Sequence, residues 1–191
     1  MNIKYFLLAT AVCLASLSGC AIDMSKVEGD VSGPQKDWKA SLEEMMPLLG
    51  HRNWIVIADM AYPLQSGEGI VTFYADQPYL EVLKTTVGMI DEYPHVFAHI
   101  YNDKELGFIT EDMVKGIGQL KEGIKSAVGP EASSAPHEEL ISRLDEAGKL
   151  FTVVIIKTPL TVPYTTTFLE LDCDYWDAAR QKILDSKISG N

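Results

Sequence analysis

The sequence has little positive charge, little cysteine and no long apolar run, and each shortage excludes something. Its 191 residues hold 16 Lys and Arg against 27 Asp and Glu, a formal charge of −11. This acidic balance argues against a nucleic acid as partner, because phosphates repel such a chain. The apolar run Tyr5–Ala15 is too short to span a bilayer as a helix. We find no internal repeat.

The first twenty residues have the pattern of an export signal. Lys4 gives a positive start, the apolar run follows, and Leu17-Ser18-Gly19-Cys20 closes it. These four residues resemble the lipobox of bacterial lipoproteins, in which the cysteine thiol takes a diacylglycerol. We therefore expect residues 1–19 to be removed and Cys20 to anchor the chain by lipid in the cell envelope, on the periplasmic or outer-membrane side. An ordinary secretory signal that contains a cysteine is the alternative.

Cysteine usage agrees with export. Cys13 would leave with the signal and Cys20 would be acylated, so only Cys173 stays in the folded part and no internal disulfide is possible. Asp172 and Asp174 flank Cys173 and oppose thiolate formation, which favours a structural thiol over a nucleophile. Removal of residues 1–19 takes away one base and no acid, so the formal charge falls from −11 to −12.

The rest of the chain divides into a tether and a domain. Residues 20–36 hold Ser, Gly, Asp, Lys and Pro with few large apolar residues, which is typical of a flexible tether. Residues 37–191 are enough for one domain with a single core.

Apolar spacing predicts alternating helices and strands in this domain. The run Trp54–Ala58 is typical of a buried strand, because it is apolar and β-branched at its centre. Further strands are expected at 69–73, 96–101, 151–156 and 164–171, and helices at 37–49, 76–93, 110–124, 136–149 and 175–186. This order predicts an α/β layered sandwich with a largely parallel central sheet and helices on both faces.

Three loops are candidates for ligand contact, because ligands of such sheets collect outside the strand ends. They are Gly50–Asn53 before the strand at Trp54, Asp59–Pro63 after it, and Lys157–Tyr164 between the last two strands.

The same loops resemble a known family. Leu49-Gly50-His51, followed by Ile55–Asp59 and Pro63, is similar to the Leu-Gly-His…Ala-Asp-x-x-x-Pro signature of the ribose pyranase and fucose mutarotase family, and the eight-residue step from His51 to Asp59 matches. Near the end, Lys157-Thr158 and Pro163-Tyr164 resemble the family's Arg-Thr-Gly-Glu-x-x-Pro-Tyr-x-Asn segment. The resemblance spans roughly residues 38 to 171.

The resemblance implies a cofactor-free isomerase that interconverts cyclic forms of a monosaccharide such as ribose or fucose. Ring opening needs one proton removed from the anomeric hydroxyl and one delivered to the ring oxygen, and histidine titrates in the right range. We expect His51 to be the catalytic group, with Asp59, Tyr164 and Thr166 binding the sugar. The resemblance also implies a ring-shaped assembly with sites at subunit interfaces, so a homo-oligomer is expected.

The sequence departs from the family at polar positions. Pro159 and Leu160 replace Gly-Glu, and Thr166 replaces Asn. The family often has a further basic residue or histidine in the helix before the penultimate strand, for which His137 and Arg143 are the candidates. These departures leave open a second hypothesis, a non-catalytic carbohydrate-binding or assembly lipoprotein that kept the fold.

Each candidate residue has a plainer interpretation. His51 could terminate the preceding helix, Asp59 could cap the turn before Pro63, and Tyr164 could be an ordinary strand aromatic. Eight extended residues could also part His51 from Asp59 by more than about 20 Å, so a shared pocket requires a fold-back or a second chain.

We predict no metal site. His95 and His99 are four residues apart, but no acidic or cysteine partner stands at ligand spacing near them, which favours packing or surface roles.

Overall fold

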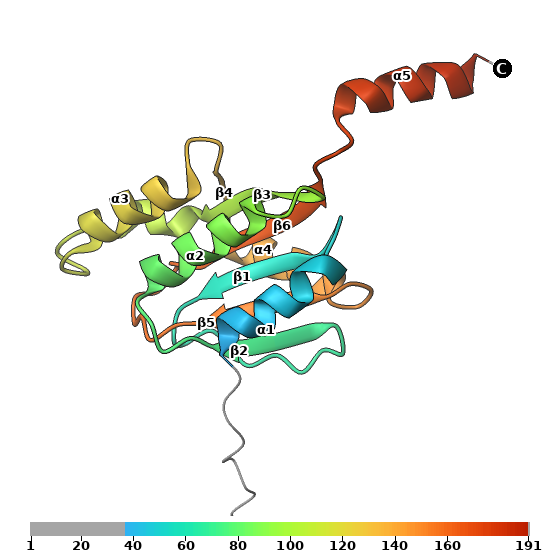
Figure 1. Cartoon of the computed structure of the whole chain (residues 1–191). Coiled ribbons are helices and arrows are strands. Elements are labelled where there is room, and N and C mark those ends of the chain that lie inside the picture. The colour runs from blue at the N-terminus through green and yellow to red at the C-terminus, as the bar shows by residue number, and fades with distance from the viewer. Residues whose placement is uncertain (1–36, 191) are drawn as a thin grey trace, which may run out of the picture. The chain divides into compact units, whose positions relative to one another are not determined.

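A computed structural model describes residues 37–190, and it contains a six-stranded sheet with helices on both faces (Figure 1). The expected signal, the tether, Cys13 and Cys20 lie outside the described residues. The strands are β1 (Trp54–Ala58), β2 (Ile70–Tyr74), β3 (Val96–Asp103), β4 (Ser133–Ala135), β5 (Val153–Lys157) and β6 (Thr167–Cys173).

The sheet is largely parallel, as the sequence predicts. Its strand order is β2-β5-β1-β6-β3-β4, and β6 alone runs antiparallel to its neighbours β1 and β3. Val56 in β1 pairs with Ile155 of β5 on one side and with Phe168 of β6 on the other. All five residues of β1 are buried, because the strand is central and both faces are covered.

Helices cover the two faces unequally. Helices α1 (Trp38–Met45), α2 (Tyr79–Asp91) and α3 (Ile117–Val128) pack with one face of the sheet through the cluster that includes Leu42, Leu83, Ile124, Ile57 and Ile156. Helix α4 (His137–Ala147) packs on the other face, where Leu140 and Leu144 meet Val56, Ile155 and Phe168. The predicted α/β layered sandwich is therefore confirmed.

Several element boundaries differ from the sequence predictions, and backbone conformation explains two of the shifts at a start. Helix α3 begins at Ile117 rather than near Thr110, because Gly116 has a φ of 83° and breaks the helical path. Strand β6 begins at Thr167 rather than at Tyr164, because Tyr164 has a φ of 57° and cannot continue an extended strand. Strand β4 was not predicted; its three residues lie in a loop rich in Gly, Ser and Pro.

Two 3-10 helices and a last α-helix complete the described part of the chain. The 3-10 helices η2 (Met46–Leu48) and η3 (Lys104–Phe108) follow α1 and β3. The last helix, α5 (Ala178–Ser189), is capped by Asp177, whose carboxylate accepts a hydrogen bond from the Arg180 N–H, and it has no buried residue. Within residues 37–190, every helix is too short or too polar to cross a membrane.

Candidate functional site

The loops that leave β1 and β5 meet at the carboxyl end of the parallel strands. The Thr158 N–H donates to the Ala58 carbonyl at 2.9 Å, and the Met60 N–H donates to the Leu160 carbonyl at 2.8 Å. Between the two loops and the start of α4 lies a pocket of about 400 Å³. Its polar side chains are those of Asp59, Tyr62, His137, Thr161 and Tyr164. This volume is in the range of small-molecule sites.

Asp59 lines this pocket with an oriented carboxylate. The residue is 8% exposed, and its Oδ1 accepts a hydrogen bond from the Ala61 N–H at 2.7 Å. Asp59 thus does cap the turn toward Pro63, but a carboxylate has about four acceptor positions and this bond uses one. The remaining positions can accept hydrogen bonds from a ligand.

His137 enters the pocket from the first residue of α4, and Asp103 at the end of β3 orients it. The two side chains are joined by a bond of 2.9 Å between His137 Nδ1 and Asp103 Oδ1. The Asp103 side chain is fully buried; burial raises the pKa of its carboxyl, and the hydrogen bond to His137 opposes that rise. Because Nδ1 is held by Asp103, Nε2 is the ring nitrogen left for a ligand.

Tyr164 completes one wall and stands against His137. The two ring centroids are 5.6 Å apart with planes at 85°, an edge-to-face contact. Tyr164 is 42% exposed and adopts the left-handed backbone conformation, which is costly for a residue with a side chain. Its backbone therefore stores strain beside the pocket.

Tyr62 and Thr166 are both buried, and only Tyr62 lines the pocket. Tyr62 is 4% exposed, and burial and the nearby charge of Asp145 raise the pKa of its phenol far above its usual value, so it stays protonated. Thr166 is 1% exposed and is absent from the pocket wall. Within the described residues, neither hydroxyl has a hydrogen-bond partner.

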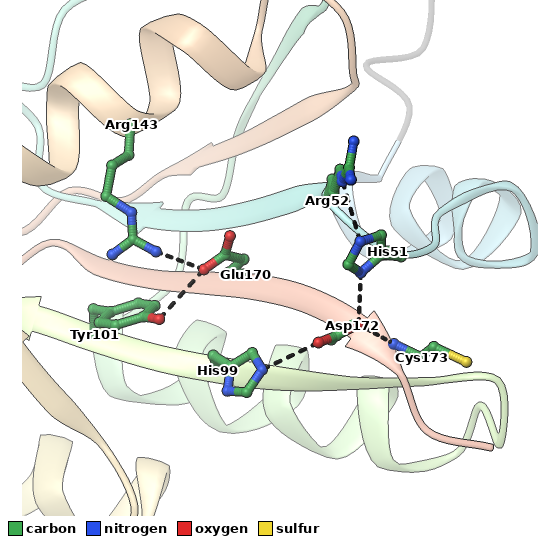
Figure 2. Close-up of polar contacts among 8 residues, drawn as sticks. All are labelled: His51, Arg52, His99, Tyr101, Arg143, Glu170, Asp172 and Cys173. Atoms are coloured by element: carbon green, nitrogen blue, oxygen red, sulfur yellow. Dashed lines mark hydrogen bonds and ion pairs between the residues drawn. The ribbon is translucent and has the colours of Figure 1, made fainter. Parts of the chain in front are cut away.

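His51 lies at the opposite end of β1 from Asp59, in an exposed cluster shown in Figure 2. Its Nδ1 bonds Asp172 Oδ1 at 2.6 Å, and the Nε–H of Arg52 donates to its Nε2 at 3.1 Å. His99 Nε2 meets the other oxygen of Asp172 at 3.3 Å. Since five strand residues span about 16 Å, one chain does not bring His51 to the pocket that holds Asp59 and Tyr164.

Arg143 forms a second polar network, which lies beside the His51 cluster in Figure 2. Its Nη2 donates to Glu170 at 2.6 Å, and its guanidinium lies 4.4 Å from the ring centre of Tyr101 and 5.1 Å from that of Trp54. Of the two candidates that the sequence offers in this helix, His137 lines the pocket and Arg143 does not.

The remaining histidine, His95, and the thiol of Cys173 have ordinary surroundings. His95 Nε2 lies 3.0 Å from the Leu49 carbonyl, and Cys173 is a free, half-buried thiol. Among residues 37–190, no three His, Cys, Asp or Glu side chains are placed to hold a metal ion.

Sequence reasoning missed Asp103. The signal that singled out Asp59, a carboxylate directly after an apolar strand, also stands at the end of β3, but the strand was expected to stop at Tyr101.

Comparison of the sequence with family models and with curated proteins finds no match. Among solved structures, the chain is similar to Bacillus subtilis RbsD complexed with D-ribose, at 20% identity and a TM-score of 0.48, over 70% of this chain and 92% of that one. It is also similar to the fucose mutarotase complexed with L-fucose from Streptococcus pneumoniae, at 17% identity and a TM-score of 0.47, over 69% and 91% of the two chains. FucU from Bifidobacterium longum gives 18% identity and a TM-score of 0.45, over 70% and 94%.

Proposed function

We propose that this pocket binds a free monosaccharide and that the protein interconverts the cyclic forms of the sugar without a cofactor. One observation carries the proposal: an imidazole oriented by a buried carboxylate shares a pocket with the carboxylate of Asp59 and the phenol of Tyr164. A proton-transfer group, a hydrogen-bond acceptor and an aromatic wall are what a sugar that must open its ring requires.

In the proposed reaction, His137 Nε2 takes the proton from the anomeric hydroxyl while the bond between C1 and the ring oxygen breaks. An acid, the Tyr164 hydroxyl or a water, gives a proton to the ring oxygen, and the open-chain carbonyl form results. Attack of a sugar hydroxyl on the carbonyl, with the protons moving back, closes the ring. Asp103 stabilises the imidazolium that forms, and Asp59 holds another sugar hydroxyl.

His51 keeps a proposed catalytic role only if a second chain carries it to the pocket. Asp172 orients its ring, and 56% of its side chain is exposed, so it is available to a neighbouring subunit. We include in the proposal a homo-oligomer in which the amino end of one sheet meets the pocket of another chain.

Two-dimensional NMR exchange on ribose and fucose tests the proposal and separates the two histidines. Wild type is compared with His137→Ala and His51→Ala. His95→Ala is the control, because His95 belongs neither to the pocket nor to the exposed cluster that holds His51. We expect His137→Ala to lower the catalysed exchange rate about a hundredfold, with His95→Ala unchanged. A matching loss in His51→Ala supports a site shared between chains. Full exchange in His137→Ala contradicts its role.

A non-catalytic protein that binds carbohydrate or takes part in an assembly is the second candidate. It is favoured by the position of Thr166, which is buried outside the pocket wall where the family pattern has an amide. It predicts that wild type binds sugar and leaves exchange at the uncatalysed rate.

The lipid anchor on Cys20 and the location in the cell envelope are part of the proposal. The lipobox-like segment that ends at Cys20 supports them. Membrane partitioning of the full-length chain is expected to be lost in Cys20→Ser. Equal partitioning of the two proteins excludes the lipid.

A further inference from the structure

A second cavity lies behind Asp103 and is lined by lysines. It has a volume of about 360 Å³ and lies between η3, the second half of α3 and the short strand β4. Lys104, Lys121 and Lys125 are its basic side chains, and Asn102 and Ser134 add neutral polar groups. The pocket with Asp59 and His137 has a different set of lining residues.

Lys121 is held in place at this cavity. Its ammonium donates to the Ile109 carbonyl at 2.6 Å and to the Gly107 carbonyl at 3.1 Å. An ammonium has three N–H donors, so these bonds leave one for a ligand. The entropy of ordering a long side chain is already lost in the free protein, which lowers the cost of binding.

Within the described residues the three cavity lysines have no ion pair, as is also true of Lys84, Lys115, Lys157, Lys182 and Lys187. Lys39 pairs with Glu43 and Lys149 with Glu146, but no carboxylate within residues 37–190 comes within ion-pair distance of the three cavity lysines. The charge of Lys121 helps to lower the pKa of Glu111, after the hydrogen bonds from Gly118 and Gly116, without forming an ion pair.

One carboxylate in the wall offsets at most one of the three positive charges. Asp103 lines the cavity, but its side chain is fully buried and its Oδ1 is bonded to His137. Three positive charges around one hollow attract an anion even on a chain of net negative charge, because the local field decides binding.

A solvated helix face accounts for only part of this arrangement. Lys121 and Lys125 stand one turn apart on α3, and Lys125 in the last turn suits the helix dipole. Neither fact explains why Lys104 comes from η3 to the same hollow or why two carbonyls hold the Lys121 ammonium.

We propose that this cavity is a binding site for a phosphate group carried by a small organic molecule. Lysine is a point-charge partner for phosphate, and the cavity is larger than inorganic phosphate needs. The site is independent of the sugar reaction proposed above, so either can fail alone.

Isothermal titration of the full chain with inorganic phosphate and with glycerol 3-phosphate tests the site. We expect glycerol 3-phosphate to bind more tightly, with an affinity that falls as salt is added. Lys121→Gln and Lys125→Gln each weaken binding about tenfold, as the loss of one charged hydrogen bond requires. Lys182→Gln on α5 makes the same charge change elsewhere and leaves the affinity unchanged.

Two readouts protect the test from a folding defect. Lys125→Gln removes no hydrogen bond of the described fold. It therefore still tests the site in the event that Lys121→Gln unfolds the end of η3. The imidazole NMR signals of His137, whose Nδ1 is bonded to the cavity residue Asp103, shift on binding, whereas those of His95 do not. The proposal is wrong if wild type binds neither compound, or if Lys125→Gln and Lys182→Gln bind glycerol 3-phosphate equally.

Discussion

The two ends of the sheet each hold an aspartate bonded to a histidine, and the two pairs differ in burial. At the carboxyl end, Asp103 and His137 are 2.9 Å apart with side chains 0% and 25% exposed. At the amino end, Asp172 and His51 are 2.6 Å apart with side chains 34% and 56% exposed. The shorter bond lies in water, where charges are screened, so bond length alone does not identify the functional pair.

The pKa values of the two aspartates shift in opposite directions. Burial raises the pKa of Asp103. Burial also acts to raise the pKa of Asp172, but hydrogen bonds from Cys173, His51 and His99 outweigh it, and the pKa is lowered. A carboxylate that is costly to keep charged is typical of a functional site, whereas a stabilised surface carboxylate is typical of a structural one.

Of the substitutions that test the difference between the two aspartate–histidine pairs, Asp103→Asn should have the largest effect, on the rate of sugar exchange. Asparagine still accepts the His137 Nδ1–H bond but cannot stabilise an imidazolium, so we expect sugar exchange to fall between about tenfold and a hundredfold. In the wild type, a folded pKa above the unfolded value of 3.8 makes stability fall as the pH rises through the folded pKa. The variant lacks this fall, which thermal unfolding at several pH values measures. A large loss of stability at all pH values would instead show a purely structural role.

The substitution Asp59→Asn should weaken sugar binding. Asparagine keeps the oxygen that caps Ala61 but loses the charge, and the affinity is expected to fall about tenfold. Saturation-transfer NMR on ribose and fucose measures it. Asp172→Asn is the matched control at the other end of the sheet: equal losses in both variants would mean that a second chain brings the amino end into the site.

Much of the fold follows from the sequence. Strand β1 has the predicted bounds, and the layered α/β class is confirmed, because a fully apolar strand between turn residues has few other solutions. The antiparallel placement of β6 could not be predicted, since the direction in which a strand pairs depends on tertiary contacts.

The site follows from the sequence less well. The carboxyl-end loops were predicted to matter, and Asp59 and Tyr164 share a pocket there. The eight-residue step from His51 matches the family pattern, but a straight strand puts this histidine at the far end. The pairing of His137 with Asp103 spans 34 residues and depends on the crossover through α3, which sequence spacing does not encode.

The ion pair at the amino end should contribute little to stability. We expect Asp172→Asn to lower the free energy of unfolding by less than about 1 kcal/mol, as for other exposed pairs. Because the folded pKa of Asp172 is lowered, its contribution is present above the unfolded value of 3.8 and is lost as the pH falls through the folded value. Urea unfolding at two salt concentrations checks this, and a loss that salt does not reduce would indicate a role in packing.

The smallest effects concern backbone strain, which the two ends share. Arg52 has a φ of 74° and Tyr164 a φ of 57°. At each position the Gly variant should be more stable than the Ala variant by about 1 kcal/mol, because both lose the side chain and only alanine keeps the strain. Thermal unfolding of the four variants measures the two differences.

Sugar binding then separates the two strained residues. Both variants at position 164 should bind ribose and fucose less tightly, because the aromatic wall beside His137 is gone. Both variants at position 52 should bind as the wild type does where the pocket is complete within one chain, and more weakly where a second chain brings the amino end into it. Strain at Tyr164 is then retained because the ring must face the pocket. Normal binding by the Tyr164→Gly variant would remove that reason and leave the strain at the carboxyl end no more functional than the strain at Arg52.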